Sequence, residues 1–211
     1  YKRQCIICVK SEVAANRVMS SVTKWLTEHL RVEVNATKTK VARPKEIKYL
    51  GFSFYQKNGE WKPKPHIKSV KKLEYKLKPL LKRNWGVSME YRMKKINEVT
   101  RGWINYYRIA DMKRILTRIE DKIRFHIRMC YWKQWKTVKN RANHRYFLGM
   151  PRYWCWLYAN TRKGYCRTGR WLGRWITNKI LKQKGLLSLV DHYTKVHAFQ
   201  PVSYTHLTLP T

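Results

Sequence analysis

The sequence predicts an α+β fold that is mostly α-helical. Apolar residues recur at helical spacing over several long stretches, whereas strand-like alternation appears only in short runs within the first 61 residues. In addition, 44% of the 211 residues are hydrophobic, which is too many for a disordered basic tail. We therefore expect a folded chain in which a helix and small strands precede a bundle of helices.

The first element expected is a buried strand from Cys5 to Val9, because this short apolar run contains β-branched residues. Ser11 then caps a helix from Glu12 to Leu30, whose apolar residues form one stripe. A stripe of this kind predicts that the helix packs against the rest of the protein. Strand-like alternation returns at Val32 and Val34.

A β-hairpin is expected around Asn58-Gly59, a dipeptide that favours tight turns. Ahead of it, the run from Ile47 to Tyr55 carries Phe52 and Phe54 at alternate positions. The prolines of Lys62-Pro63-Lys64-Pro65 exclude a helix, because proline disfavours α geometry in the residue before it. We place a domain boundary between residues 61 and 62.

Three amphipathic helices are expected in a unit covering residues 62–136. The first begins at Ile67, Ser88 opens the second, and Asp111 opens the third. Their apolar faces predict a helical bundle with one shared core. We expect the following residues to be buried together: Leu73, Leu77, Ile96, Trp103, Ile115, Ile119 and Ile123.

Residues 137–200 are less periodic, basic and rich in tryptophan, with short helices expected around residues 138–148 and 171–182. The last eleven residues, 201–211, resemble a translated sequencing adaptor. We interpret them as non-native, exclude them from the fold, and expect them to pack against nothing.

The charge of the chain indicates a polyanionic partner. Lys and Arg number 47 against 12 Asp and Glu, and no acidic residue occurs from Lys122 to Val190. Self-repulsion of this size opposes compaction, and bound phosphate would relieve it, so nucleic acid is the expected partner. No apolar run approaches the roughly 20 residues of a membrane span, so a membrane partner is not expected.

Catalytic and metal sites are not predicted from the residues themselves. The only adjacent acids, Glu120 and Asp121, are expected on a solvated helix face rather than at a two-metal site. Cys5 and Cys8 form a C-x-x-C, but without a second pair at finger spacing we expect two residues of a buried strand. The five cysteines are odd in number and irregularly spaced, which favours an intracellular, cytoplasmic location.

Several stretches resemble the group II intron reverse transcriptase/maturase family. Their order and spacing match the family from Tyr1 to about Tyr193: YKRQCIICVKS at the start, SEVAANRVMSSVTKWLTEHLRVEVNATKTKV, YLGFSF from Tyr49, RGWINYY from Arg101, MCYWKQWK from Met129, and YANTRKGY from Tyr158. The resemblance implies that residues 1–61 end a reverse transcriptase palm, that residues 62–136 form the thumb or maturase-specific X domain, and that residues 137–200 bind RNA or DNA.

The resemblance fails where the family's polymerase chemistry lies. The family has two metal-binding aspartates where this chain has Arg3 and Gln4, and a cation there would repel Mg²⁺. We therefore predict no catalytic residue and no cofactor for this chain. A longer parent protein, with its upstream residues, is expected to use Mg²⁺ as an RNA-directed DNA polymerase, which leaves the enzyme question open.

Binding residues are predicted in two groups. The resemblance implies that Leu50, Gly51 and Phe52 correspond to the primer grip, and an ordinary strand glycine at a bulge is an equal alternative. The RNA-binding candidates are Lys68, Lys71, Lys72, Arg101, Arg108, Lys133, Trp135, Lys136, Lys139, Arg141, Arg162 and Lys163. Trp103, Tyr106 and Tyr107 lie at helical spacing, so we expect core packing rather than RNA stacking.

The leading functional interpretation is a maturase module that binds group II intron RNA in a ribonucleoprotein of bacterial type and assists its splicing. Target DNA is a second candidate partner. The alternative is a nonspecific basic nucleic-acid-binding protein, which would bind unrelated structured RNAs equally well at matched salt. Nothing in the sequence predicts an oligomeric state.

Overall fold

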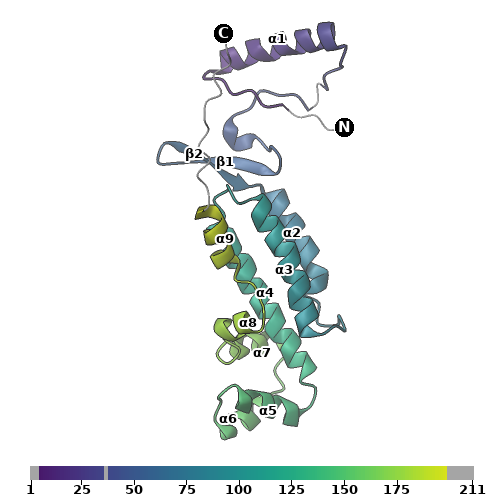
Figure 1. Cartoon of the computed structure of the whole chain (residues 1–211), viewed down its shortest axis with the longest axis vertical. Helices are drawn as coiled ribbons and strands as arrows, with labels where there is room; N and C mark the ends of the chain where they lie inside the picture. The colour runs from purple at the N-terminus through teal and green to yellow at the C-terminus, as the bar shows by residue number, and fades with distance from the viewer. Residues whose placement is uncertain (1–4, 36–37, 199–211) are drawn as a thin grey trace.

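The computed structural model describes residues 5–35 and 38–198. These residues form nine α-helices, one short 3-10 helix and a two-stranded antiparallel sheet, arranged along one long axis (Figure 1). The prediction of a mostly helical α+β fold is confirmed. Arg3, Gln4 and the segment 201–211 lie outside the described residues.

Helix α1 (Glu12–Leu30) forms as predicted, with the Ser11 hydroxyl accepting a hydrogen bond from the Ala14 N–H at 3.2 Å. It lies at one end of the molecule beyond the sheet (Figure 1). The prediction that it packs into the core is wrong, because none of its residues is buried. An apolar stripe indicates that a helix can pack, but not which surface covers it.

The strands predicted at Cys5–Val9 and at Val32 and Val34 are also wrong. Residues 5–9 and 31–35 belong to no strand, and Cys5 and Cys8 are exposed. A strand needs a neighbouring strand for its backbone hydrogen bonds, and no described strand lies beside either segment. Alternation in the sequence does not supply that partner.

The hairpin is confirmed. Strand β1 (Phe52–Lys57) pairs with β2 (Glu60–Pro65), with Phe52 opposite Pro65 and Lys57 opposite Glu60. Asn58 and Gly59 connect them with φ of 51° and 82°, the positive values that a type I′ turn requires. The sheet thus runs through the boundary placed between residues 61 and 62. A short 3-10 helix, η1 (Pro44–Glu46), lies against β1.

Helices α2 (Ile67–Leu80), α3 (Met89–Tyr106) and α4 (Lys113–Gln134) form the expected bundle (Figure 1). Ser88 caps α3 as predicted. Asp111 does not cap α4, because Met112 occupies that position and the Asp111 carboxylate instead accepts a hydrogen bond from the Tyr55 hydroxyl. The predicted core is confirmed: Leu73, Leu77, Ile96, Ile119 and Ile123 are buried, with Trp103 and Ile115 packed against them.

Five shorter helices follow: α5 (Val138–Phe147), α6 (Arg152–Ala159), α7 (Tyr165–Leu172), α8 (Asn178–Gln183) and α9 (Leu189–Ala198). Helices α5 and α6 enclose a small core of their own, whereas α7 and α9 pack along α4. The helix expected at 138–148 is confirmed. The one expected at 171–182 is two helices, because α7 ends at Leu172 and α8 begins at Asn178.

The Arg145 side chain connects the small core of α5 and α6 to the end of α4. Its guanidinium lies 4.9 Å from the ring centre of Trp132 and 5.4 Å from that of Tyr158. The side chain is buried, and burial lowers the pKa of Arg145 to about 10. The cation is therefore held between two aromatic rings rather than presented to a ligand.

Helix α9, which the sequence analysis did not predict, closes the bundle. Its Tyr193 hydroxyl donates to the Ala110 carbonyl at 2.8 Å. The loop before it is held by Asn97, which donates to the Gly185 carbonyl at 2.7 Å and accepts from the Leu187 N–H at 2.9 Å. These bonds join α3 and the α3–α4 connection to a segment more than 80 residues away.

Glu120 is buried, so the solvated position predicted for it is wrong. Its carboxylate pairs with Arg124 on the same helix and accepts from the Val190 N–H at 3.3 Å. Asp121 points to solvent as predicted. Helix α9, which was not predicted from the sequence, lies over the Glu120 side of α4.

Candidate nucleic-acid interface

The residues predicted to resemble a primer grip form a tight turn where the sheet meets the bundle. Tyr49 and Phe52 exchange two backbone hydrogen bonds, of 3.1 and 2.7 Å, across Leu50 and Gly51. Both turn residues have positive φ, 47° and 85°, so this is a turn rather than the bulge considered as the alternative. The structure therefore brings the three predicted residues together.

Gly51 is required by the protein's own packing. A Cβ atom at this position would lie 2.3 Å from the Tyr107 hydroxyl oxygen. The Gly51 carbonyl accepts from the His66 N–H at 2.8 Å and from the Ser69 hydroxyl at 3.0 Å, while the Tyr106 hydroxyl donates to the Leu50 carbonyl at 2.9 Å. The turn is thereby fixed on the ends of α2 and α3.

The aromatic residues of α3 are divided between core and surface. Tyr107 is buried against Phe52, with ring centres 4.9 Å apart, and Trp103 is half-buried against Tyr107. The core prediction is confirmed for these two residues. Tyr106 is 56% exposed and lies over the turn, so the core prediction is wrong for this residue.

Arg101 and Arg108, which flank these aromatics, are both exposed. Arg101 contributes to a positive field near α9: the pKa of His192 lies below its ordinary value because of burial first, and then because of Arg101 and Lys195. His197 contacts the Arg108 carbonyl through Nδ1 at 2.7 Å, which leaves the Arg108 guanidinium outside that contact.

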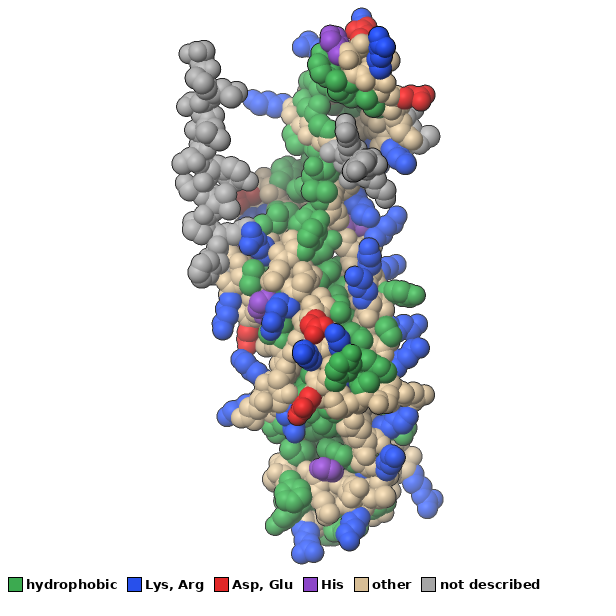
Figure 2. All heavy atoms as spheres, turned by 45° about the vertical axis from the view of Figure 1, so that its right-hand side comes forward, with side chains coloured by type: hydrophobic (Ala, Val, Ile, Leu, Met, Phe, Trp, Pro, Cys, Tyr) green, Lys and Arg blue, Asp and Glu red, His purple; other side chains and the backbone are tan. Residues whose placement is uncertain are grey.

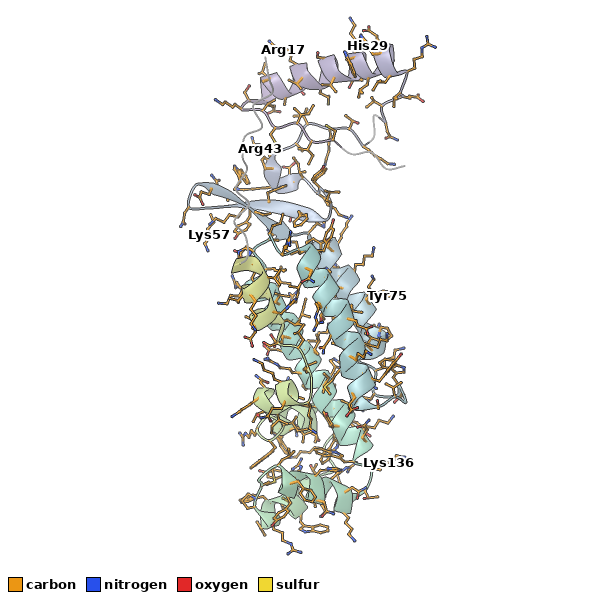
Figure 3. The ribbon with its side chains drawn as sticks, viewed as in Figure 1. Arg17, His29, Arg43, Lys57, Tyr75 and Lys136 are labelled. Carbon is orange, nitrogen blue, oxygen red and sulfur yellow. The ribbon has the colours of Figure 1, made fainter. Side chains whose placement is uncertain are left out.

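Lys68, Lys71 and Lys72 are exposed along α2. Tyr75 on the same helix was not predicted; it is 77% exposed and lies on the outer side of the bundle (Figure 3). One turn separates Tyr75 from Lys71 and Lys72, so they share a face. A signal was available, because Tyr75 is an aromatic residue off the apolar stripe of its helix.

The candidates around the end of α4 differ in their surroundings. Trp135 is buried, with its ring stacked 4.9 Å from His144, and so belongs to the protein interior. Arg141 donates to the Trp135 carbonyl at 2.9 Å and covers the Trp132 ring at 4.4 Å. These side chains hold the α4–α5 connection in place.

The remaining candidates are cations near the far end of the molecule. Lys136, Lys139, Arg162 and Lys163 are exposed, and Lys163 lies 4.5 Å from the ring centre of Trp171. Lys133 is half-buried and donates to the Asn84 side-chain oxygen at 2.6 Å. Lys136 lies far along the long axis from Tyr75 (Figure 3). The predicted residues therefore do not form one compact patch.

The positive charge is spread over the length of the molecule. Lys and Arg side chains line the face seen in Figure 2, on which acidic side chains are few. Among residues 5–35 and 38–198, no three His, Cys, Asp or Glu side chains come together as a metal site would require. In the same part of the chain, no helix is long and apolar enough to cross a membrane.

One comparison with known protein families finds a match, and it covers most of the helical bundle. The family model described as the group II intron, maturase-specific domain matches residues 70–147, which run from the first turn of α2 to the end of α5. A comparison with curated proteins gives no match. Residues 70–147 are therefore similar to the group II intron maturase-specific domain.

Proposed function

We propose that the chain binds the folded RNA of a group II intron and stabilises its splicing-active form, while the RNA performs the splicing chemistry. The observation that carries this proposal is the maturase-specific match over residues 70–147. Those residues form α2 to α5, whose surface presents Lys71, Lys72, Arg101, Lys136 and Lys139 to solvent.

Such a surface would stabilise folded RNA by holding positive charges at fixed positions. Folding of a large RNA brings phosphates close together, and the resulting repulsion is relieved by cations. Lysine and arginine side chains held on a rigid bundle supply that compensation without the entropy cost of ordering free ions. We therefore expect the protein to lower the Mg²⁺ concentration at which the intron splices.

Specificity in this proposal comes from shape and not from charge alone. Structured RNA is recognised through its phosphates, its 2′-hydroxyls and its unstacked bases. The separated groups of cations on α2, α3 and the α4–α5 connection suit a partner with several phosphate-lined surfaces.

The proposal is tested by splicing of the cognate intron at decreasing Mg²⁺, with and without the purified chain. We expect the midpoint Mg²⁺ concentration to fall when the chain is added. An unrelated structured RNA of equal length, at the same salt, serves as the control and is expected to bind more weakly.

A nonspecific basic nucleic-acid-binding protein is the second candidate, and the wide distribution of cations over the surface favours it. It predicts equal affinity for the cognate intron and the unrelated RNA, together with no change in the Mg²⁺ midpoint. That pair of results would overturn the maturase proposal.

A further inference from the structure

A groove of about 1070 Å³ lies between α2, α4 and the start of α7. Its volume reaches the upper end of the roughly 300–1,000 Å³ that small-molecule pockets occupy. The floor is apolar and is contributed by Leu77, Leu81, Ile119, Ile123 and Met129. None of the residues that the sequence analysis selected for RNA binding lines it.

The walls of the groove are strongly basic. The cations lining it are Lys78, Lys82, Arg83, Lys122 and Arg167. Glu74 is the one carboxylate among its lining residues, and it lies 3.4 Å from the Lys122 ammonium group, which offsets its charge. A ligand that fills this groove must therefore bring negative charge of its own.

Two aromatic rings accompany these cations. Tyr75 lies at the rim and is 77% exposed, so most of its side chain is accessible to a ligand. Tyr165 lines the groove from α7 and is covered by the Arg83 guanidinium, 4.0 Å from its ring centre. Aromatic rings beside cations are the combination that stacks bases and binds phosphates in proteins that hold single strands.

His126 supplies a polar group that need not carry charge. It lines the groove from α4, and its pKa is lowered by burial first and then by Lys122 and Arg83. A pKa below the ordinary value near 6.5 leaves the imidazole neutral at pH 7, able both to donate and to accept a hydrogen bond. It can therefore contact a base edge, whereas its cationic neighbours contact phosphates.

A groove with an apolar floor and basic walls favours unpaired over paired nucleic acid. In an RNA duplex the bases are stacked inward, and phosphates and 2′-hydroxyls form the contact surface. Only unstacked bases can place their faces on a recessed apolar floor while their phosphates remain at the rim. An acidic peptide would satisfy the cations but would leave Tyr75 without a planar partner.

We propose that the groove between α2, α4 and α7 binds an unpaired segment of RNA, with phosphates on Lys78, Lys82 and Arg83 and a base stacked on Tyr75. This inference rests on the proposed role in intron binding and adds the part of the RNA that the bundle recognises. The segment lies outside paired helices, in a loop, a bulge or a strand between two helices.

The first test measures binding of a short, unstructured, fluorescently labelled RNA to the full chain by anisotropy at fixed salt. Lys78→Ala with Lys82→Ala removes two groove cations, and we expect affinity to fall about tenfold or more. Lys76→Ala with Lys94→Ala removes the same charge from exposed side chains of α2 and α3 that do not line the groove. This control pair is expected to have a much smaller effect, and equal losses for both pairs would overturn the proposal.

Substitutions of Tyr75 test the contribution of base stacking separately from that of charge. Because the side chain is exposed, Tyr75→Ala should leave the melting temperature unchanged. Loss of one stacked base corresponds to a fall in affinity of about fivefold to a hundredfold. Tyr75→Phe keeps the ring and should bind as the unchanged protein does. If Tyr75→Ala binds the RNA with full affinity, the stacking role is wrong.

The position of the RNA is tested through Cys166, which is exposed and lines the groove. In a Cys5→Ser, Cys8→Ser background, the short RNA should slow alkylation of Cys166. A duplex of the same sequence should protect it less. Stronger protection by the duplex, by single-stranded DNA of the same sequence or by an acidic peptide would overturn the assignment to unpaired RNA.

Failure of this inference is distinguishable from failure of the proposed function. If the unchanged protein assists splicing but Lys78→Ala with Lys82→Ala binds the short RNA as its control pair does, the groove assignment alone is wrong. If the unchanged protein neither lowers the Mg²⁺ requirement nor prefers the cognate intron, the maturase proposal is wrong whatever the groove binds.

Discussion

The Glu120 carboxylate is one of the groups that hold α9 against the bundle, together with Asn97 and Tyr193. Its oxygens bond to Arg124 on one side and to the Val190 N–H on the other. Both the carboxylate and its guanidinium partner are largely removed from water, so neither can exchange this contact for hydration at low cost. Removing one partner of this pair therefore costs more than breaking an exposed ion pair would.

Glu120→Ala should lower the free energy of unfolding by about 3–5 kcal/mol, because it leaves a poorly hydrated guanidinium and a backbone N–H without their partner. Urea unfolding followed by circular dichroism measures this change. Asp121→Ala on the same turn is the matched control, since Asp121 is exposed, and should stay within about 0.5 kcal/mol. Equal losses for the two variants would show that Glu120 is not a link between helices.

Gly51 and Gly59 allow backbone strain to be separated from crowding. Both have φ above +80°, but a Cβ at Gly59 meets nothing within 4 Å, whereas one at Gly51 meets Tyr107. Gly59→Ala should lose about 1–2 kcal/mol from the left-handed backbone alone. Gly51→Ala should lose a further 1–3 kcal/mol or so from overpacking, because the Tyr107 ring is held among other aromatics. Equal melting temperatures would mean that Tyr107 moves aside freely.

At the scale of elements, the helices that bury a wide apolar face were predictable from the sequence. The residues of α2, α3 and α4 recur at helical spacing, and Ser88 marks the start of α3. The failures share one cause. Strand pairing, the covering of α1 and the docking of α9 depend on residues distant in the chain, and local periodicity contains no information about them.

The candidate site was predictable to a similar extent. Surface lysines such as Lys68, Lys71 and Lys136 could be recognised because charge is rarely buried. Trp135 could not be separated from an exposed base-stacking residue, since its burial depends on packing against His144 and Arg141. The groove could not be predicted from the sequence, because its walls come from three helices that lie side by side only in the folded protein.

The docking of α9 should depend on Asn97. Asn97→Ala removes one hydrogen bond to Gly185 and one from Leu187. Loss of the pair should cost about 1–3 kcal/mol and should increase amide hydrogen exchange in residues 185–198 before any change in α2. Glu98→Ala, one position along α3 and exposed, is the control and should leave that exchange unchanged. Faster exchange throughout the bundle would instead indicate global destabilisation.

At the scale of the whole molecule, the number of phosphates engaged is measurable from salt dependence. Arg101→Ala with Lys136→Ala should reduce the slope of log affinity against log salt by about two, if each side chain contacts one phosphate. Lys24→Ala with Lys62→Ala removes the same charge from cations that already face Glu28 and Glu60. An equal change of slope in this control pair would show that only net charge matters.

The whole chain should incorporate no nucleotides on a primed RNA template with Mg²⁺. Arg3 and Gln4 stand where the family that the chain resembles has aspartates, and a cation at that position disfavours metal binding. Primer extension with a labelled primer checks this expectation, with a no-protein reaction as the baseline. Extension above that baseline would contradict it.

The late position of α9 in the chain has a consequence for biosynthesis. Helices α2, α3 and α4 leave the ribosome before α9, yet the bonds that complete their packing come from Leu187, Val190 and Tyr193. Until those residues emerge, the nascent bundle has one uncovered apolar side. Chains stalled before residue 185 should therefore engage chaperones and remain sensitive to protease, whereas chains released after residue 198 should not.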